Sequence, residues 1–136
     1  ISGTNYRLLR YADVLLMAAE ANNRKASPDD AKALRYLNEV RARVNQPALS
    51  VTGNDLFAAI KQERRLELAF EWVRYQDLIR WGDAATVLAD QGKQIPRGDG
   101  SYFELSDAGF KERHWLLPFP ETEINVNPNI VQNPGW

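Results

Sequence analysis

The stretch from Asp55 to Trp81 constrains the fold most, because it sets charged side chains within a long apolar helical pattern. At about 100° per residue, one broad face carries apolar and charged side chains together. This face contains Leu56, Ala59, Ile60, Glu63, Leu66, Glu67, Phe70, Val73, Arg74, Asp77, Leu78 and Trp81. A second apolar stripe contains Phe57, Leu68, Trp72, Tyr75 and Ile79. Because a helix that is apolar on two sides packs between neighbours, the pattern predicts one central helix.

Three acids, Glu63, Glu67 and Glu71, stack one helical turn apart on this stretch. Like charges at this spacing cost roughly 0.2–0.5 kcal/mol per pair even when solvated. Arginine suits them as a partner because its planar guanidinium binds carboxylate in a two-pronged way. Arginines occur within the stretch and on the preceding predicted helix, namely Arg64, Arg74 and Arg80, then Arg41 and Arg43. The pattern predicts a structural ion network of Glu63, Arg64, Glu67, Glu71, Arg74, Asp77 and Arg80.

Two chemical roles compete with this structural role. A helical di-metal site needs a histidine three residues after a glutamate, but the only histidine is His114, far along the chain. A general acid and base pair needs two carboxylates in unlike environments, whereas the arginines would hold these acids ionised. The pattern therefore predicts no catalytic residue, no metal site and no cofactor. An enzyme acting through Glu63, Glu67 or Asp77 is the less favoured alternative.

Composition excludes several classes of protein. The 136 residues, 44% of them hydrophobic, are the size of one domain with its own core. With 17 basic and 18 acidic residues, there is no broad cationic surface for nucleic acid or anionic lipid. The lack of cysteine excludes disulfides and thiolate sites within these residues. The first residue is Ile1 and nothing resembling a signal peptide precedes the first helical pattern, so we expect a processed chain or a piece of a longer one.

Two further helices are predicted upstream of the central one. The first runs from Tyr6 to about Ala21, with apolar residues at helical spacing in Leu8, Leu9, Ala12, Leu15, Leu16 and Ala19. The second begins at Ser27-Pro28-Asp29-Asp30, where Ser27 is the expected cap, and runs to about Val44. Its expected buried face is Ala31, Leu34, Leu37, Val40 or Arg41, and Val44. Their short connection predicts an antiparallel pair.

The character of the chain changes after a short helix expected from Ala84 to about Asp90. Pro96, Gly98, Gly100 and Gly109 are typical of turns, while residues 102–105 could form a brief strand. The tail is rich in Trp, Phe and Leu, and we expect it to wrap over the helices. The sequence thus predicts an all-α single domain, residues 1–136. It consists of antiparallel helix pairs in a scaffold (1–91) and an irregular wrapping tail (92–136).

Helix pairs repeating near 40 residues are typical of helical-repeat proteins, whose units bury their faces only by stacking. Two such units look incomplete. We expect the first helix to lack a neighbour and to leave Tyr6, Leu9 and Val14 partly uncovered. A generic helical-repeat interaction module, binding a peptide or partner helix between its helices, is therefore one functional hypothesis.

Several motifs, in order, resemble the C-terminal portion of the SusD/RagB family. They begin with Arg10-Tyr11-Ala12-Asp13-Val14-Leu15-Leu16-Met17 and Leu37-Asn38-Glu39-Val40-Arg41. The most recognisable is Glu63-Arg64-Arg65, Glu67-Leu68, Phe70-Glu71, Arg74, Asp77-Leu78 and Arg80-Trp81. The closing ones are Leu117-Pro118-Phe119-Pro120 and Gln132-Asn133-Pro134-Gly135-Trp136. Trp72 stands where the family commonly has Gly, and Gln76 where an aromatic is common, so the stretch 55–81 could form one helix or two.

The resemblance implies a helical scaffold like tetratricopeptide repeats within a longer lipoprotein of the Bacteroidetes. Such proteins capture glycans or other nutrients at the surface of the outer membrane. They are held there by an N-terminal lipid and deliver ligand to a SusC-type TonB-dependent transporter. They are binding proteins and not enzymes. Because the family's ligand contacts come largely from a portion missing here, the signature residues match a scaffold role, and Tyr102, Phe103 and Trp115 are the candidate sugar-stacking residues in this chain.

Overall fold

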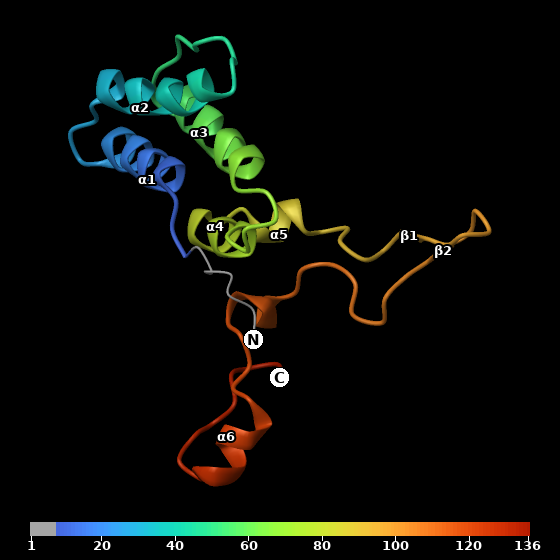
Figure 1. Cartoon of the computed structure of the whole chain (residues 1–136). Coiled ribbons are helices and arrows are strands. Elements are labelled where there is room, and N and C mark those ends of the chain that lie inside the picture. Colours follow the sequence, from blue (N-terminus) through green and yellow to red (C-terminus); the bar gives the residue numbers. More distant parts are fainter. Residues whose placement is uncertain (1–7) are drawn as a thin grey trace, which may run out of the picture. The chain divides into compact units, whose positions relative to one another are not determined.

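The computed structural model describes residues 8–136, which divide into two compact units (Figure 1). The first unit ends at Arg74, and the second runs from Tyr75 to Trp136. Tyr6, where the first helix was expected to begin, lies outside the described residues. The single domain of 1–136 and the wrapping of the tail over the helices stay predictions.

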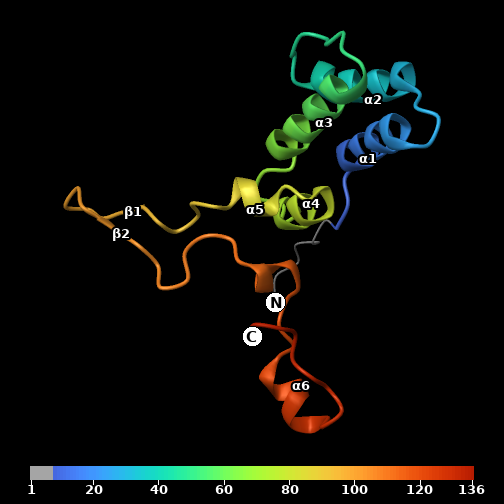
Figure 2. The same ribbon diagram turned by 180° about the vertical axis from the view of Figure 1, so that it is seen from behind.

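The first unit is a layer of three helices, α1 (Tyr11–Arg24), α2 (Asp30–Arg43) and α3 (Gly53–Glu67). Each packs against the other two, as both views of the ribbon show (Figures 1 and 2). The apolar faces meet in one core, which contains Ala12, Leu15, Leu16, Ala19, Ala33, Leu37, Val40, Leu56 and Ile60. This apolar core fixes the relative positions of the three helices, and charged side chains lie at the helix ends.

The ends of α1 and α2 differ from the sequence expectations. Arg10 is extended (φ −119°, ψ 154°), so α1 begins at Tyr11 and continues to Arg24, past the expected end at Ala21. Helix α2 is capped by Asp29, whose carboxylate accepts from the Lys32 backbone N–H at 3.0 Å, rather than by Ser27.

The buried face of α2 also differs from the expected one. Because α2 starts at Asp30, its buried line is Ala33, Leu37 and Val40, while Ala31 is exposed. Val44 lies beyond the helical end, at the C-cap position, and is also exposed.

The stretch 55–81, which the sequence left as one helix or two, forms two, because the chain breaks between α3 and α4 (Arg74–Trp81). Between them, Phe70 and Trp72 have left-handed backbones with φ of 66° and 67°. Such values are incompatible with a continuing right-handed helix. The apolar stripes therefore stop at buried Leu68, and Leu66, Phe70 and Trp72 are exposed. A glycine would adopt this conformation without strain.

The second unit is mostly irregular. Its regular elements are most of α4, then α5 (Ala84–Val87), β1 (Ile95–Pro96), β2 (Tyr102–Phe103), a 3₁₀ helix (Glu112–Trp115) and α6 (Glu121–Val126). Strands β1 and β2 form an antiparallel hairpin in which Ile95 faces Phe103 and Pro96 faces Tyr102. The short helix α5 ends at Val87, before the expected Asp90. With helices as the dominant element, the predicted all-α class is confirmed.

The closing segment folds back on residues just upstream of it. The side-chain amide of Gln132 accepts from the Phe119 N–H at 2.9 Å and donates to the Phe119 carbonyl at 3.0 Å. The Trp136 indole N–H lies 3.0 Å from the carbonyl oxygens of Arg113 and Leu116. Polar bonds rather than burial hold this region, because no residue from 85 to 136 is buried.

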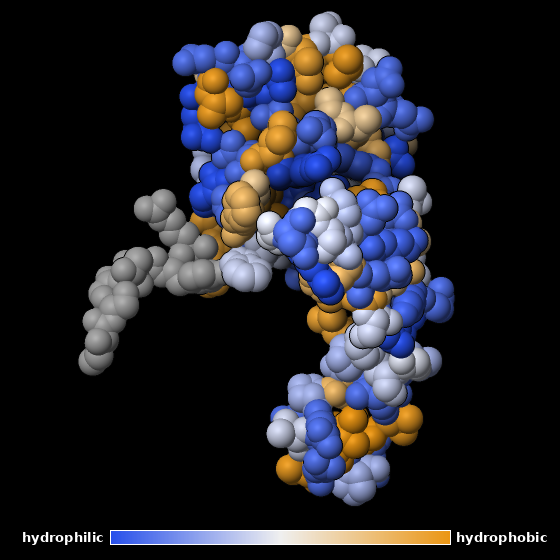
Figure 3. All heavy atoms as spheres, turned by 90° about the vertical axis from the view of Figure 1, so that its right-hand side faces the viewer, coloured by the Kyte–Doolittle hydropathy of each residue, from blue (hydrophilic) through white to orange (hydrophobic). Residues whose placement is uncertain are grey.

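Apolar side chains reach the surface of the described chain in several places, drawn in orange in Figure 3. The exposed large hydrophobic residues of α1 include Tyr11, Val14 and Met17, and Leu8 and Leu9 are exposed just before it. Leu9 and Val14 are among the exposed residues, so their predicted exposure is confirmed.

Among residues 8–136, the helices lack the length and apolar character that a membrane span requires.

Candidate functional site

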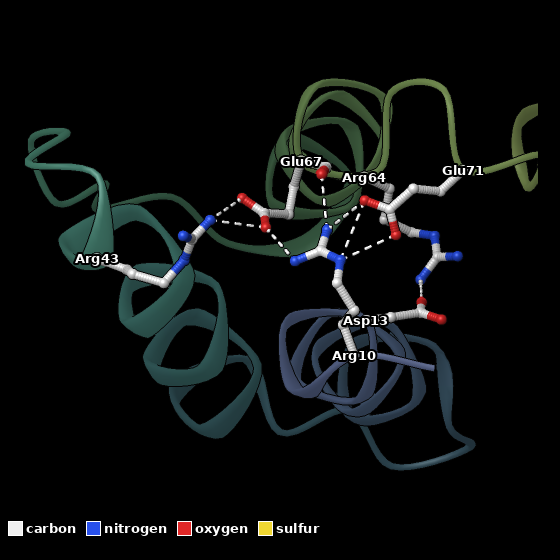
Figure 4. Close-up of polar contacts among 6 residues, drawn as sticks. All are labelled: Arg10, Asp13, Arg43, Arg64, Glu67 and Glu71. Carbon is white, nitrogen blue, oxygen red and sulfur yellow. Dashed lines mark hydrogen bonds and ion pairs between the residues drawn. The ribbon is translucent and has the colours of Figure 1, made fainter. Parts of the chain in front are cut away.

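Glu67, the last residue of α3, binds arginines from two other elements (Figure 4). Its carboxylate accepts from Arg10 Nη1 at 2.8 Å, and Arg10 Nη2 also donates to the Glu67 backbone carbonyl at 2.8 Å. From the last turn of α2, Arg43 Nη2 donates to both carboxylate oxygens at 2.7 Å. The Glu67 side chain is only 7% exposed. One buried carboxylate thus joins the start of α1, the end of α2 and the end of α3.

Arg10 also binds a second acid, Glu71, which lies in the loop between α3 and α4. Its Nε lies 3.0 and 2.9 Å from the two carboxylate oxygens, and Nη2 donates to Oε1 at 2.7 Å. This is the two-pronged geometry in which guanidinium binds carboxylate most strongly. The same guanidinium therefore fixes the end of α3 and the loop that follows it (Figure 4).

Two further ion pairs connect α3 to its neighbours. Arg64 Nη1 donates to Asp13 Oδ1 of α1 at 2.8 Å, and both side chains are largely buried. Arg41 Nη1 of α2 donates to Glu63 Oε2 at 2.8 Å. Breaking such a pair strands the other charge in a desolvated place, so these contacts set the register of the helices.

The pairing determines how these groups titrate. Burial of Glu67 disfavours its charged form, but the hydrogen bonds from Arg10 and Arg43 outweigh burial, and the pKa of Glu67 lies below its ordinary value of 4.5. The hydrogen bonds from Glu71 and then Glu67 raise the pKa of Arg10 further above its already high value. Both groups are therefore firmly charged at neutral pH, which suits a fixed ion pair and does not suit proton transfer.

Arg74, Asp77 and Arg80, also expected in the network, lie on α4. Arg80 pairs with Asp77 one turn away, at 2.9 Å, and its guanidinium lies 4.7 Å from the Trp81 ring centroid. Within residues 8–136, the ion pairs of Glu67 and Glu71 come from Arg10 and Arg43, and none comes from Arg74. The structure thus pairs Glu63, Glu67 and Glu71 with arginines of α2 and with Arg10, the residue before α1, while Arg64 pairs with Asp13 of α1.

Arg10 is the residue that the spacing argument missed. It precedes α1 by one residue and lies 57 and 61 residues before its acidic partners. Helical spacing identifies only neighbours three or four positions apart. The available signal was its place in the Arg10-Tyr11-Ala12-Asp13 motif, where a charged residue directly precedes a buried apolar helix.

The candidate stacking residues lie on two elements of the second unit. Tyr102 and Phe103 form β2, where both are exposed and the Arg97 guanidinium lies 5.2 Å from the Phe103 ring centroid. Trp115, on the 3₁₀ helix, packs edge-on against Phe110 with ring centroids 4.9 Å apart. It lines a cavity of about 390 Å³ together with Glu112, Arg113 and Gly135. Trp115 is thus half-buried beside open space, while the hairpin residues project from a two-stranded ribbon.

The same unit contains a small charged cluster around Asp107. Lys111 and Arg113 both donate to its carboxylate, and these hydrogen bonds hold the pKa of Asp107 well below its usual range. His114 Nε2 lies 3.3 Å from the same carboxylate, while Nδ1 accepts from the Lys111 backbone N–H at 3.0 Å. In the described part of the chain, no three His, Asp or Glu side chains are placed to hold a metal ion.

Comparisons with known proteins agree with one another. The model of the SusD family matches residues 1–136. The chain is 34% identical to SusD-like protein P2 of Formosa agariphila over 99% of its length and 36% identical to SusD-like protein P25 over 95%. It spans only 26% and 24% of those proteins, about a quarter of their length.

Solved structures show the same pattern. A SusD-like protein from Bacteroides fragilis has a TM-score of 0.74 at 29% identity, covering 95% of this chain and 25% of that one. Surface glycan-binding protein A from Bacteroides uniformis has a TM-score of 0.70 at 32% identity, covering 95% and 27%. All four proteins resemble the present chain over nearly its whole length.

Proposed function

This chain belongs to the SusD family, and from that premise we propose that it is the C-terminal scaffold segment of a surface glycan-binding lipoprotein. The observation that carries the proposal is the match over all 136 residues to a family that includes a surface glycan-binding protein. In the proposed function, the whole protein captures a glycan or other nutrient at the outer membrane surface. It then delivers this ligand to a SusC-type TonB-dependent transporter.

The role proposed for this segment is mechanical rather than chemical. The carboxylates Glu63, Glu67 and Glu71 are bound by arginines at 2.7–2.8 Å. Such paired acids hold elements in place, because their oxygens are already bound by fixed guanidinium groups. We therefore propose a binding protein without catalytic activity, in which α1, α2 and α3 form a rigid support.

The test uses the full-length protein that contains this chain. We expect it to bind at least one polysaccharide in affinity gel electrophoresis, and to recover a TonB-dependent transporter when purified from detergent-solubilised outer membranes. Release of product from the bound polysaccharide should stay at the background of the buffer. A protein that binds none of the polysaccharides and recovers no transporter would contradict the proposal, as would hydrolysis that depends on Glu63.

A specific observation supports a second candidate, the helical-repeat interaction module. Between α1 and α2 lies a groove of about 370 Å³ with an apolar floor of Ala12, Leu15 and Val40 and a rim that includes Tyr11 and Glu39. A partner helix or peptide could lay an apolar side chain there. Replacement of the exposed rim residue Tyr11 by Asp would then abolish protein binding while glycan binding persists, whereas the leading proposal predicts that Tyr11→Asp affects neither ligand.

A further inference from the structure

Two exposed aromatic rings lie in the loop between α3 and α4. Phe70 is 101% exposed and Trp72 is 83% exposed, and both have left-handed backbones with φ of 66° and 67°. A left-handed conformation costs a residue with a side chain roughly 1–2 kcal/mol. Burial of the rings does not offset this cost. Strain of this kind persists where the surrounding structure imposes it and is concentrated at functional sites.

An ion pair holds the residue between the two strained ones. Glu71 is the residue between Phe70 and Trp72, and Arg10 binds its carboxylate at 2.7–3.0 Å. Glu71 is thus fixed, while the side chains on either side of it are exposed.

A cavity of about 190 Å³ opens beside these rings, within the first unit. Among the described residues, its apolar walls include Leu8, Phe70 and Trp72, and its charged groups are Arg10, Asp13 and Glu71. At ~30 Å³ per water molecule, the volume corresponds to about six waters. An α-helix, ~10–12 Å across, does not fit such a space. A single six-membered sugar ring with its hydroxyl groups has a volume of the same order as the cavity.

The charges of the cavity favour a neutral, hydroxyl-rich ligand. Arg10 is neutralised by Glu67 and Glu71, and Asp13 by Arg64. A charged ligand would compete with these pairs, whereas hydroxyl groups can use the remaining lone pairs of Glu71 and Asp13. An indole ring beside them offers a flat apolar face. Apolar walls with a few fixed polar groups are the usual make-up of a small-molecule site.

We propose that Trp72 and Phe70 form a stacking site for one sugar unit of a neutral glycan, with Glu71 and Asp13 accepting hydrogen bonds from its hydroxyl groups. The proposal rests on the proposed function and adds a site to it, in the helical unit and apart from the hairpin and the 3₁₀ helix. Arg10 is a positioning residue here, because it orients Glu71.

The substitution Trp72→Gly tests the site directly, because it removes the ring and also relieves the backbone strain. In the full-length protein, affinity electrophoresis against soluble starch, laminarin, xylan and galactomannan measures the effect. We expect Trp72→Gly to weaken binding about tenfold, ~1.4 kcal/mol, without lowering the unfolding temperature. Trp72→Tyr keeps a stacking ring and should bind like the unmodified protein.

Two control variants test specificity. Asn45→Gly changes another left-handed residue, with φ of 56°, outside the cavity. Leu66→Ala removes an exposed apolar side chain that does not line the cavity. Neither should alter binding.

Each outcome decides the proposal. If the protein binds a polysaccharide and Trp72→Gly binds it equally well, the site is wrong and the proposed function stands. If the protein recovers the transporter but binds none of these polysaccharides, the sugar site is wrong and the proposed function stands. If Trp72→Gly lowers the unfolding temperature of the full-length protein, the ring packs against another part of the protein, and the sugar site is wrong.

Discussion

A single guanidinium organises the charged side chains of the first unit. Arg10 binds the carboxylate and the backbone carbonyl of Glu67 and also the carboxylate of Glu71. An isolated carboxylate as buried as Glu67 would be strongly disfavoured in its charged form. The cost of burying this acid is therefore offset by a residue that stands outside any helix.

Replacing Arg10 by Ala leaves two acids without their main partner. We expect a loss of about 3 kcal/mol in the free energy of unfolding, at the low end for a buried pair because Arg10 is partly exposed. Urea unfolding monitored by circular dichroism measures the loss. Arg65→Ala, an exposed arginine of α3, is the matched control and should change little. Arg74→Ala should also change little, and a large effect of Arg74 with none of Arg10 would contradict the assignment of partners.

The depressed pKa of Glu67 predicts a dependence of stability on pH. A carboxylate whose pKa is lower in the folded state stabilises the protein above its unfolded pKa, near 4.5, and this contribution is lost as pH falls through the folded pKa. The difference in unfolding free energy between the unmodified chain and Glu67→Gln should be constant from pH 7 to about 5 and shrink below. A difference that grows toward acid pH would contradict the lowered pKa.

At the level of elements, the break between α3 and α4 decides where the side chains of the signature motif point. Residues that a single helix would place on one buried face are divided between buried Leu68 and exposed Phe70 and Trp72. The break directs Glu71 to Arg10 and frees α4 to begin at Arg74. Two strained residues are the energetic cost of this arrangement.

Comparing two small residues at position 72 isolates the strain. Both Trp72→Gly and Trp72→Ala remove the exposed ring, but only Gly adopts φ near +67° freely. We expect the Gly variant to be more stable than the Ala variant by about 1 kcal/mol, measured by urea unfolding of the two proteins side by side. Equal stability would mean that the backbone at position 72 is not left-handed.

Gly109 predicts the opposite response in the second unit. Its φ is 78°, and a Cβ there would lie 2.7 Å from the backbone carbonyl oxygen of Ala89. Gly109→Ala should therefore destabilise the unit by more than the ~1–2 kcal/mol of the left-handed backbone alone. Gly98→Ala is the control, because no atom lies within 4 Å of its Cβ position. Thermal unfolding of both variants tests the prediction, which fails if the two melt alike.

The helices of the first unit were predictable because apolar residues recur at helical spacing, and Leu16, Leu37 and Ile60 are indeed buried. The break at residues 68–73 was not, since nothing in the apolar period signals that Phe70 and Trp72 adopt a conformation typical of Gly. For the site, spacing identified the acids. It could not identify Arg10, because pairing across 57 residues depends on how helices pack.

For the whole molecule, burial is distributed unevenly along the chain. The buried residues lie between Ala12 and Ala84, and none lies in residues 85–136. The latter part is held by turns, by a two-stranded ribbon and by side chains such as Gln132 bonded to the backbone. Regions with few buried apolar contacts open at low free energy.

Hydrogen exchange should therefore separate the two regions. We expect amides of α1, α2 and α3 to exchange orders of magnitude more slowly than those of residues 88–131, when this chain is examined by mass spectrometry. The Phe119 amide, bonded to the Gln132 side chain at 2.9 Å, should be slower than its neighbours and lose that protection in Gln132→Ala. Uniform slow exchange along the chain would contradict the uneven burial.

The shared guanidinium of Arg10 also has an evolutionary consequence. Arg10 pairs with two acids at once. If it is replaced by an uncharged residue, at least one further substitution is needed to restore the charge balance around Glu67 and Glu71. Positions 10, 67 and 71 should therefore covary among descendants, and replacement of one of them alone should be selected against.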